Sequence, residues 1–544
     1  MLSLLAMQAA AIQLQQLRPH EQERPSAYAE RLGRSYADMA RSEHKRSLGQ
    51  YFTPLEVACF MARMWRGAGQ RLRVLDPGAG AGILSCALCE ALASRTEKPD
   101  EIALDAYETD VALASYLEQS LAYTKEWLLT KGVNLSFKIH TEDFVLNNAE
   151  ILSDSLSLFP NSPLRDGKFD LVIANPPYFK LPKSDPRARA AAAIVWGQPN
   201  IYAVFMAISA QMLREGGEMI VISPRSYAAG NYFQLFRERF FARMRPDAIH
   251  LFDSRCDAFS RDEVLQENMI LRARRMSGWT NNGKMEVEVS RSSGVHDLSR
   301  SQRRSVPLAE VLDVNSHDKL LRIPLADEDD EIVRIIRSWS GSLHSYGLEI
   351  STGPVVPFRA VPLICKSGNV PQTHAPLLWM QNVTAMQVDW PVTARNKSQY
   401  IIANEQSRPL LVRNQNYVLL RRFSAKEAAR RLVAAPFLAS IDAPFVGLEN
   451  HLNYVHRPGG SLSAEEACGL AALFNSALID SYFRTFNGNT QVSATELRAM
   501  PLPPLNLIKT LGGLVMTKRH DLTSLDILVE KLLTNSHKEA NVED

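Results

Sequence analysis

The stretch Arg73-Val-Leu-Asp-Pro-Gly-Ala-Gly-Ala-Gly82 decides the fold. An apolar run suited to a buried strand ends at Asp76, and a glycine-rich turn follows it. Glycines let the backbone turn tightly and approach a ligand closely because they carry no Cβ atom. The apolar run Ile83–Ala93 then predicts a helix. This order indicates either an ordinary βα connection or a nucleotide-binding turn.

Short apolar runs alternate with helical patterns from about Arg71 to Arg272. Besides the helix at Ile83–Ala93, a second helix is predicted at Ala112–Leu129. The further predicted strands are Ile102–Tyr107, Leu135–His140, Phe169–Ala174 and Met219–Ser223. Such alternation is typical of a parallel sheet with crossover helices. We therefore predict an α/β, Rossmann-like fold for this part.

The composition excludes several classes of protein. The chain has 544 residues, of which 46% are hydrophobic and 22% charged, as in soluble globular proteins. Its 61 Lys and Arg nearly balance its 59 Asp and Glu, so any nucleic-acid surface must be a local patch. The six Cys are scattered and indicate reduced thiols, and no apolar run is long enough to span a membrane. We expect a cytoplasmic protein.

Glu108 is the second feature of a nucleoside site. It follows the predicted strand Ile102–Tyr107, where a carboxylate can accept hydrogen bonds from ribose hydroxyls. Together with the glycine-rich turn, it predicts a nucleoside-bearing cofactor without saying which one.

The motif Asn175-Pro-Pro-Tyr178 narrows the choice of nucleoside-bearing cofactor. It follows the strand Phe169–Ala174, and two prolines cannot continue a strand or freely begin a helix. They therefore stiffen a turn at the carboxyl edge of the sheet, where open α/β sheets bind ligands. The Asn175 side-chain oxygen and the Pro176 carbonyl can both accept hydrogen bonds from an NH₂ group, and Tyr178 offers a flat face.

The chain resembles the gamma-class adenine-N6 DNA methyltransferases of restriction–modification systems. The family order is a Gly-Gln-Tyr-Phe-Thr-Pro segment, a glycine-rich cofactor loop, an Asn-Pro-Pro-Tyr motif and a C-terminal recognition domain. The matching pieces here are Gly49–Pro54, Asp76–Gly82 and Asn175–Tyr178. The resemblance implies a class I methyltransferase sheet with a C-terminal mixed α+β target recognition domain.

The resemblance also implies S-adenosylmethionine as the cofactor. Thr53 would help to hold its methionine carboxylate, and Glu108 its ribose. The other residues that the resemblance places around the cofactor are Asp76, Gly78 and Gly80 at the methionine end and Asp143 and Phe144 at the adenine.

The same family catalyses its reaction on an adenine that is flipped out of the duplex. The resemblance gives the catalytic role to Asn175, Pro176, Pro177 and Tyr178. Tyr178 and Phe259 would stack on the flipped base, with Phe252 as a rival for the second position.

The expected domains follow from these motifs. They are an N-terminal helical segment (1–45), the catalytic domain (46–275), a linker (276–345), a target recognition domain (346–510) and a helical tail (511–544). Basic residues gather between Arg408 and Arg431, interleaved with Asn and Tyr, which suits contacts to phosphates and base edges. The predicted DNA-binding residues are Arg413, Arg421, Arg422, Asn487 and Asn489.

Three alternatives remain open. An NAD-dependent dehydrogenase also uses a glycine-rich turn, but it gives no reason for the Asn-Pro-Pro-Tyr motif. A methyltransferase of RNA or of protein glutamine uses that motif, but is usually much shorter. A non-catalytic DNA-binding module is disfavoured by the intact motifs.

The partners are expected from the same resemblance. Only 48 residues precede Gly49, too few for a nuclease core, so we expect a separate restriction endonuclease as the functional partner. Val264–Asn268 and Asn487–Pro504 are similar to the branch that accompanies PstI- and BsuBI-type endonucleases, which implies the site CTGCAG. We expect double-stranded DNA as the substrate, a monomer and no metal, because Cys86 and Cys89 have no second pair at zinc spacing.

Overall fold

The computed structural model describes residues 17–39, 52–154, 167–195, 199–252, 267–281, 283–314, 316, 318–365, 373–391, 397–425, 428–487, 490–517 and 521–540. The chain divides into two compact units, Met1–Leu325 (unit 1) and Ala326–Asp544 (unit 2). The division falls inside the segment 276–345 that the sequence suggests as a connection.

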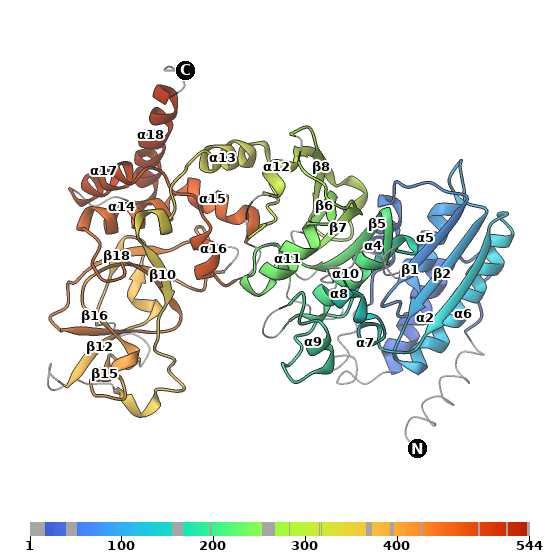
Figure 1. The fold of residues 1–544 in the computed structure, drawn as a ribbon, viewed down its shortest axis with the longest axis horizontal. Coiled ribbons are helices and arrows are strands. Elements are labelled where there is room, and N and C mark those ends of the chain that lie inside the picture. Colours follow the sequence, from blue (N-terminus) through green and yellow to red (C-terminus); the bar gives the residue numbers. More distant parts are fainter. Residues whose placement is uncertain are drawn as a thin grey trace. The chain divides into compact units, whose positions relative to one another are not determined.

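Within the described residues of unit 1, nine strands form one sheet in the order β3-β2-β1-β4-β5-β7-β6-β8-β9 (Figure 1). The strands are β1 (Arg71–Asp76), β2 (Glu101–Tyr107), β3 (Asn134–His140), β4 (Phe169–Ala174), β5 (Leu213–Pro224), β6 (Met244–Phe252), β7 (Asn268–Arg275), β8 (Glu286–Ser292) and β9 (Gln302–Pro307). The first five neighbours in this order run parallel, and β7 is antiparallel to both β5 and β6. The predicted α/β, Rossmann-like class is therefore confirmed.

Helices follow the strands in the alternation that the sequence predicts. They are α2 (Pro25–Met39), α4 (Leu55–Met64), α5 (Ile83–Ala93), α6 (Val111–Leu129), α7 (Phe144–Asn148), α8 (Glu150–Asp154), α9 (Pro186–Ala190), α10 (Ile201–Met212), α11 (Gln234–Phe241) and α12 (Leu308–Val311). Tyr28 and Leu32 of α2 are fully buried against Leu113 and Tyr116 of α6. The helix within the predicted N-terminal segment is thus part of unit 1.

The sheet has a hydrophobic core on each face because successive strand residues point to opposite sides. Leu72 and Val74 of β1 belong to a cluster with α4, α5 and α6. Leu75 belongs to a second cluster with α10 and α11. In β4, Leu171 belongs to the first of these clusters and Val172 to the second. Both faces are covered, so residues that bind a ligand are confined to the strand ends.

One sequence-based expectation is wrong. We expected a linker over 276–345 because residues 277–310 are rich in Ser, Asn, Gly and Arg, but this stretch contains β8 and β9. Val287, Val289 and Val306 are at most 1% exposed, while their neighbours in sequence are mostly polar and more exposed. Strands at the edge of a sheet, with one wet face, carry few apolar residues, and their composition therefore resembles that of a loop.

Unit 2 is a mixed α+β unit. In its described part the strands form sheets ordered β10-β20-β17-β18, β11-β15-β12-β19-β16 and β13-β14. These strands are β10 (Glu349–Thr352), β11 (Ile364–Cys365), β12 (His374–Leu378), β13 (Val383–Thr384), β14 (Gln387–Val388), β15 (Tyr400–Ile402), β16 (Leu411–Arg413), β17 (Asn416–Arg421), β18 (Ala434–Leu438), β19 (Phe445–Leu448) and β20 (Leu452–His456). The helices are α13 (Asp327–Arg337), α14 (Ala464–Asn475), α15 (Ala477–Phe486), α16 (Ala494–Arg498), α17 (Leu505–Met516) and α18 (Leu522–Ala540).

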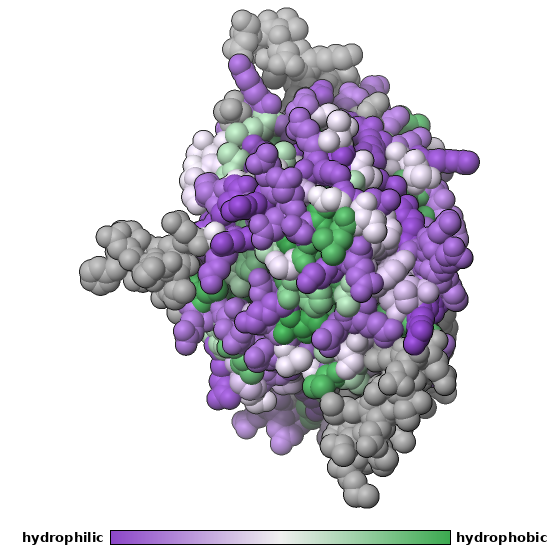
Figure 2. Space-filling model, turned by 90° about the vertical axis from the view of Figure 1, so that its right-hand side faces the viewer, coloured by the Kyte–Doolittle hydropathy of each residue, from purple (hydrophilic) through white to green (hydrophobic). Residues whose placement is uncertain are grey.

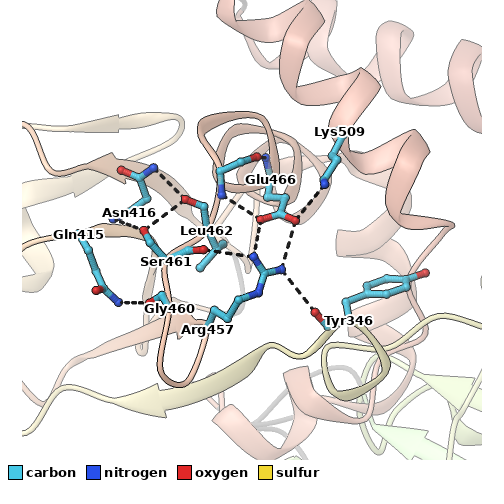
Figure 3. A network of polar contacts seen from close by, with 10 residues as sticks. Tyr346, Gln415, Asn416, Arg457, Gly460, Ser461, Leu462, Glu466 and Lys509 are labelled. Carbon is cyan, nitrogen blue, oxygen red and sulfur yellow. Dashed lines mark hydrogen bonds and ion pairs between the residues drawn. The ribbon is translucent and has the colours of Figure 1, made fainter.

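A polar network joins β20 to the helices of unit 2 (Figure 3). Glu466, near the start of α14, is buried and accepts from both terminal nitrogens of Arg457 at 3.1 and 3.2 Å. Lys509 of α17 lies 3.4 Å from the same carboxylate. Burial alone would raise the pKa of Glu466, but the Arg457 hydrogen bonds and the Ser463 backbone outweigh it, and the pKa is lowered. The carboxylate therefore stays charged and holds three elements together.

The side of unit 1 that carries β3 and α6 faces the viewer in Figure 2 and is mainly hydrophilic. Its hydrophobic residues form small groups, which is ordinary for a protein surface. None of the helices in the described ranges combines the length and apolarity that a bilayer crossing requires. The candidate functional site is a cavity at the carboxyl edge of the sheet of unit 1.

Candidate active site

The glycine-rich turn joins β1 to α5 and is as tight as the sequence predicts. Gly82 has φ +89°, and a Cβ there would lie 2.8 Å from both Leu117 Cδ1 and Ser120 Oγ. Asp76 at the end of β1 is fully buried and accepts from Ser85 Oγ at 2.7 Å. Burial raises the pKa of Asp76 to about 7 against the hydrogen bonds that it accepts. The carboxyl holds the start of α5 to the strand that precedes it.

Glu108 lies beside this turn, as predicted. Its Oε2 accepts from the backbone N–H of Gly80 at 3.1 Å, and its Oε1 accepts from that of Asp110 at 2.8 Å. Glu108 is 8% exposed, and burial raises its pKa to about 7. Gly80 has φ +57°, a conformation that favours glycine. The sheet therefore brings the two halves of the predicted nucleoside site together.

Asp143 and Phe144 follow β3, the next strand along this edge. Asp143 caps α7 by accepting from the Leu146 backbone N–H at 2.9 Å, and its second oxygen lies 3.6 Å from Arg187 Nη1. The Phe144 ring is buried and has its centroid 5.0 Å from that of Tyr107 and 4.9 Å from that of Phe205. An aromatic wall with a carboxylate at its edge suits a purine ring that bears an amino group.

One cavity connects these residues with the Asn-Pro-Pro-Tyr motif. Of the residues predicted to bind the cofactor, Gly78, Gly80, Glu108, Asp143 and Phe144 line it, whereas Thr53 and Asp76 do not. The complete lining is Phe52, Pro77, Gly78, Gly80, Tyr107, Glu108, Thr109, Leu113, Asp143, Phe144, Asn175, Pro177, Phe179, Arg187, Ile201 and Phe205.

Several lining residues were not predicted from the sequence. Phe52, Tyr107 and Phe179 each adjoin a motif residue, so their position in the chain was a usable signal. Arg187 and Phe205 lie outside every motif and reach the cavity only through the packing of α9 and α10.

The Asn175 corner lies directly beside the glycine-rich turn. A Cβ on Gly78 would be 3.6 Å from the Asn175 backbone oxygen and 3.9 Å from Pro176 Cα. This proximity arises because β1 and β4 are neighbours in the sheet. Asn175 and Pro177 line the cavity, whereas the Pro176 side chain is buried.

The carboxamide of Asn175 is held at both ends. Its Nδ2 donates to Thr53 Oγ1 at 3.0 Å, and its Oδ1 accepts from the Tyr178 hydroxyl at 2.7 Å. The same hydroxyl lies 3.3 Å from the Ile222 carbonyl. Thr53 thus contacts the predicted catalytic residue, although the family resemblance assigns it to the cofactor.

Of the two candidates for the second ring that stacks on the target base, the structure describes only Phe252. Phe252 is fully buried, with its ring centroid 4.8 Å from that of His250. It has no face open to a base, so it is not a stacking residue in this structure. Phe259 lies outside the described residues, and its role stays a prediction.

The predicted DNA-binding arginines of unit 2 differ in their surroundings. Arg413 is exposed at the end of β16. Arg421 donates through Nε to the Val383 carbonyl at 2.6 Å, and burial lowers its pKa. Arg422 donates to the Asn450 carbonyl at 3.0 Å and, with the Gln491 amide correctly oriented, to its side-chain oxygen. Only Arg413 of these three has an exposed side chain.

The prediction for Asn487 is wrong. Asn487 is 4% exposed; its oxygen accepts from Arg431 Nη2 at 2.8 Å, and its Nδ2 donates to Glu496 Oε2 at 2.9 Å. Arg431, counted with the basic cluster, is itself 1% exposed. Both side chains are buried and hydrogen-bonded inside unit 2, so they are not placed to contact a groove of DNA. Asn489 lies outside the described residues.

In the part of the chain that the structure describes, no group of three or more His, Cys, Asp or Glu residues is placed to hold a metal ion. Cys86 and Cys89 are buried in the core beside β1, as the sequence indicates, and burial raises the pKa of Cys86 to about 12.

Comparisons with known proteins identify relatives of this chain. The Eco57I restriction-modification methylase family matches residues 100–259. The type II methyltransferase M.BsuBI of Bacillus subtilis is 32% identical over 505 residues, covering 92% of this chain and 96% of that protein. M.PstI of Providencia stuartii is 32% identical over 490 residues, covering 89% and 93%. A tRNA1(Val) (adenine(37)-N6)-methyltransferase of Salmonella enteritidis PT4 is 27% identical over 191 residues, covering 34% and 63%.

Proposed function

Because this chain belongs to the type II methyltransferases of restriction–modification systems, we propose that it transfers a methyl group from S-adenosylmethionine to N6 of a flipped adenine in duplex DNA. The observation that supports this most is the position of Asn175, whose carboxamide borders a cavity lined by Glu108 and Phe144. A separate restriction endonuclease would cleave the unmodified site.

The cavity fits the cofactor's nucleoside half. Glu108 offers a carboxylate to ribose hydroxyls, and Asp143 offers one to the adenine amino group. Phe144 provides an apolar wall for the ring, backed by Tyr107 and Phe205. Asp76 fixes the turn that would lie against the methionine end of the cofactor. When bound, S-adenosylmethionine supplies an activated methyl group on its sulfonium, so no protein nucleophile is required.

The protein's task is then to prepare the acceptor. The lone pair of an adenine N6 is delocalised into the ring, which makes the nitrogen a weak nucleophile. Asn175 Oδ1 and the Pro176 carbonyl would accept its two N–H groups and favour a pyramidal nitrogen. Positive charge develops on N6 during transfer, and two neutral acceptors stabilise that state more than the ground state. Alignment of N6 with the methyl–sulfur bond contributes further.

DNA is a better substrate assignment than RNA or protein glutamine. The tRNA enzyme matches 34% of this chain, whereas the type II methyltransferases match 89% and 92% and so extend through most of unit 2. A recognition domain of this size suits a specific duplex sequence. The similarity to M.PstI and M.BsuBI supports CTGCAG as the site to be tested first. We also propose a monomer that acts in the cytoplasm, where genomic DNA lies.

The test is methyl transfer from labelled S-adenosylmethionine to a CTGCAG duplex, with the product base identified by mass spectrometry. We expect N6-methyladenine from the wild type and none from Asn175→Ala, with cofactor affinity unchanged within a few-fold. Asn134→Ala, at an exposed residue that begins β3, is the matched control and should retain full activity. Methylcytosine as the product, or turnover by Asn175→Ala, would contradict the proposal.

A further inference from the structure

Thr53 contacts the carboxamide of Asn175, far from it in sequence. Asn175 Nδ2 donates to Thr53 Oγ1 at 3.0 Å. Thr53 is 5% exposed and does not line the cavity, whereas the adjacent Phe52 does. The Thr53 hydroxyl therefore contacts the catalytic side chain directly from behind the cavity lining.

This contact decides which end of the carboxamide would face the substrate amine. An amide presents an acceptor at its oxygen and two donors at its nitrogen. If Asn175 were turned over, its NH₂ group would face the N6 amine of the substrate, and two donors would oppose each other. The Tyr178 hydroxyl has a single proton and makes its shorter contact, 2.7 Å, with Asn175 Oδ1. An acceptor at Thr53 then completes the correct orientation.

Thr53 is well placed to impose an orientation because its backbone is anchored. Pro54 follows it with φ −61° and ψ 150°, directly before α4. Within that helix Val57, Ala58 and Met61 are fully buried in the core beside β1. A hydroxyl carried by an anchored segment can hold a neighbouring side chain without much loss of conformational entropy.

We propose that Thr53 is a positioning residue that orients the Asn175 carboxamide for acceptance of the substrate amine. This inference rests on the proposed function. It makes a distinct claim, because it assigns to Thr53 an effect on the rate of transfer and none on cofactor affinity.

Thr53→Val tests the proposal, since it keeps the shape of the side chain and removes the acceptor. We expect the single-turnover rate of methyl transfer at saturating S-adenosylmethionine to fall about ten-fold, the size of one lost hydrogen bond. The Kd for S-adenosylmethionine, measured by calorimetry without DNA, should stay within two-fold of the wild type. Thr53→Ser restores the hydroxyl and should recover most of the rate.

The matched control is Thr124→Val, which removes a buried hydroxyl that donates to the Ser120 carbonyl in α6, away from the cavity lining. It should change thermal stability and leave the rate unaltered. A Kd raised ten-fold in Thr53→Val, or an unchanged rate, would overturn the role of Thr53. Absence of methyl transfer in the wild type would instead overturn the proposed function.

Discussion

Tyr178 donates its hydroxyl proton to Asn175 Oδ1 at 2.7 Å, across the two prolines that separate these residues. The ring is half-buried and packs against the cores on both faces of the sheet. Its centroid lies 6.2 Å from that of Tyr202, edge to face. Tyr178 thus has two separable features, a hydroxyl that holds Asn175 and a ring expected to stack on the flipped base.

Tyr178→Phe and Tyr178→Ala should separate these features. Phe keeps the ring and removes the hydrogen bond, so we expect the rate of transfer to fall by about three- to ten-fold with little change in DNA affinity. Ala also removes the stacking surface, worth about 1–3 kcal/mol per base, and should weaken binding of a specific duplex as well. Single-turnover kinetics and fluorescence anisotropy measure the two effects.

A duplex with an abasic site at the target adenine is the control for this pair, because no base remains to stack. Both variants should bind it equally well. If Tyr178→Ala bound the intact duplex as tightly as Tyr178→Phe does, the stacking role would have to be abandoned.

Asp143 caps α7 and is also proposed to bind the cofactor. The variants Asp143→Asn and Asp143→Ala should distinguish these two roles. Asn is also a good N-cap, so Asp143→Asn should leave the melting temperature nearly unchanged. It removes the charge beside Arg187, and we expect S-adenosylmethionine affinity to fall several-fold. Asp143→Ala should lose the cap of α7 as well, at a cost of about 1 kcal/mol of stability.

Thermal unfolding and calorimetric titration of the two variants provide the comparison. Equal melting temperatures for Asn and Ala would show that the contact with the Leu146 backbone contributes little to stability. Wild-type cofactor affinity in both variants would remove Asp143 from the proposed site.

Much of unit 1 follows from the sequence because its motifs and its hydrophobic pattern agree. The strand before Asp76 and the strand before Asn175 are apolar runs that end in residues unable to continue them, and both lie where expected. Their side-by-side position is not local, because β4 pairs with β1 although β2 and β3 lie between them in the sequence. The proximity of Gly78 to Asn175 therefore combines two local turn signals with the strand order of the whole sheet.

The remaining features depend on packing that no local pattern encodes. Arg187 and Phe205 reach the cavity from helices whose sequences carry no motif. Asn487 begins an Asn-Gly-Asn stretch, typical of an exposed turn, yet its amide is bonded to Arg431 and Glu496 in the interior. A polar side chain looks the same in sequence whether its partners are water or buried groups.

Glu108 should make stability depend on pH. Burial raises its pKa in the folded protein from 4.5 to about 7. Between these values the unfolded chain binds fewer protons than the folded one, so the contribution of Glu108 to stability falls as pH rises from about 4.5 to about 7. Glu108→Gln removes this pH-dependent contribution to stability. We expect its melting temperature, relative to the wild type without cofactor, to rise between pH 5 and pH 7.5.

The difference between the two proteins is the informative quantity, because Asp76 also has a pKa of about 7 and remains in both. Glu97→Gln, at an exposed position, is the control and should show no such trend. A constant difference between Glu108→Gln and the wild type across this range would mean that Glu108 is already ionised at pH 5.

Arg413 and Arg421 form a matched pair for locating DNA on unit 2. Arg413 is exposed, whereas the Arg421 guanidinium donates to the Val383 carbonyl. Each phosphate contact adds about −0.9 to the slope of log K against log salt concentration. We therefore expect Arg413→Ala to reduce that slope by about one and to keep its melting temperature. Arg421→Ala should lower the melting temperature and leave the slope unchanged, and the reverse pattern would move the phosphate contact to Arg421.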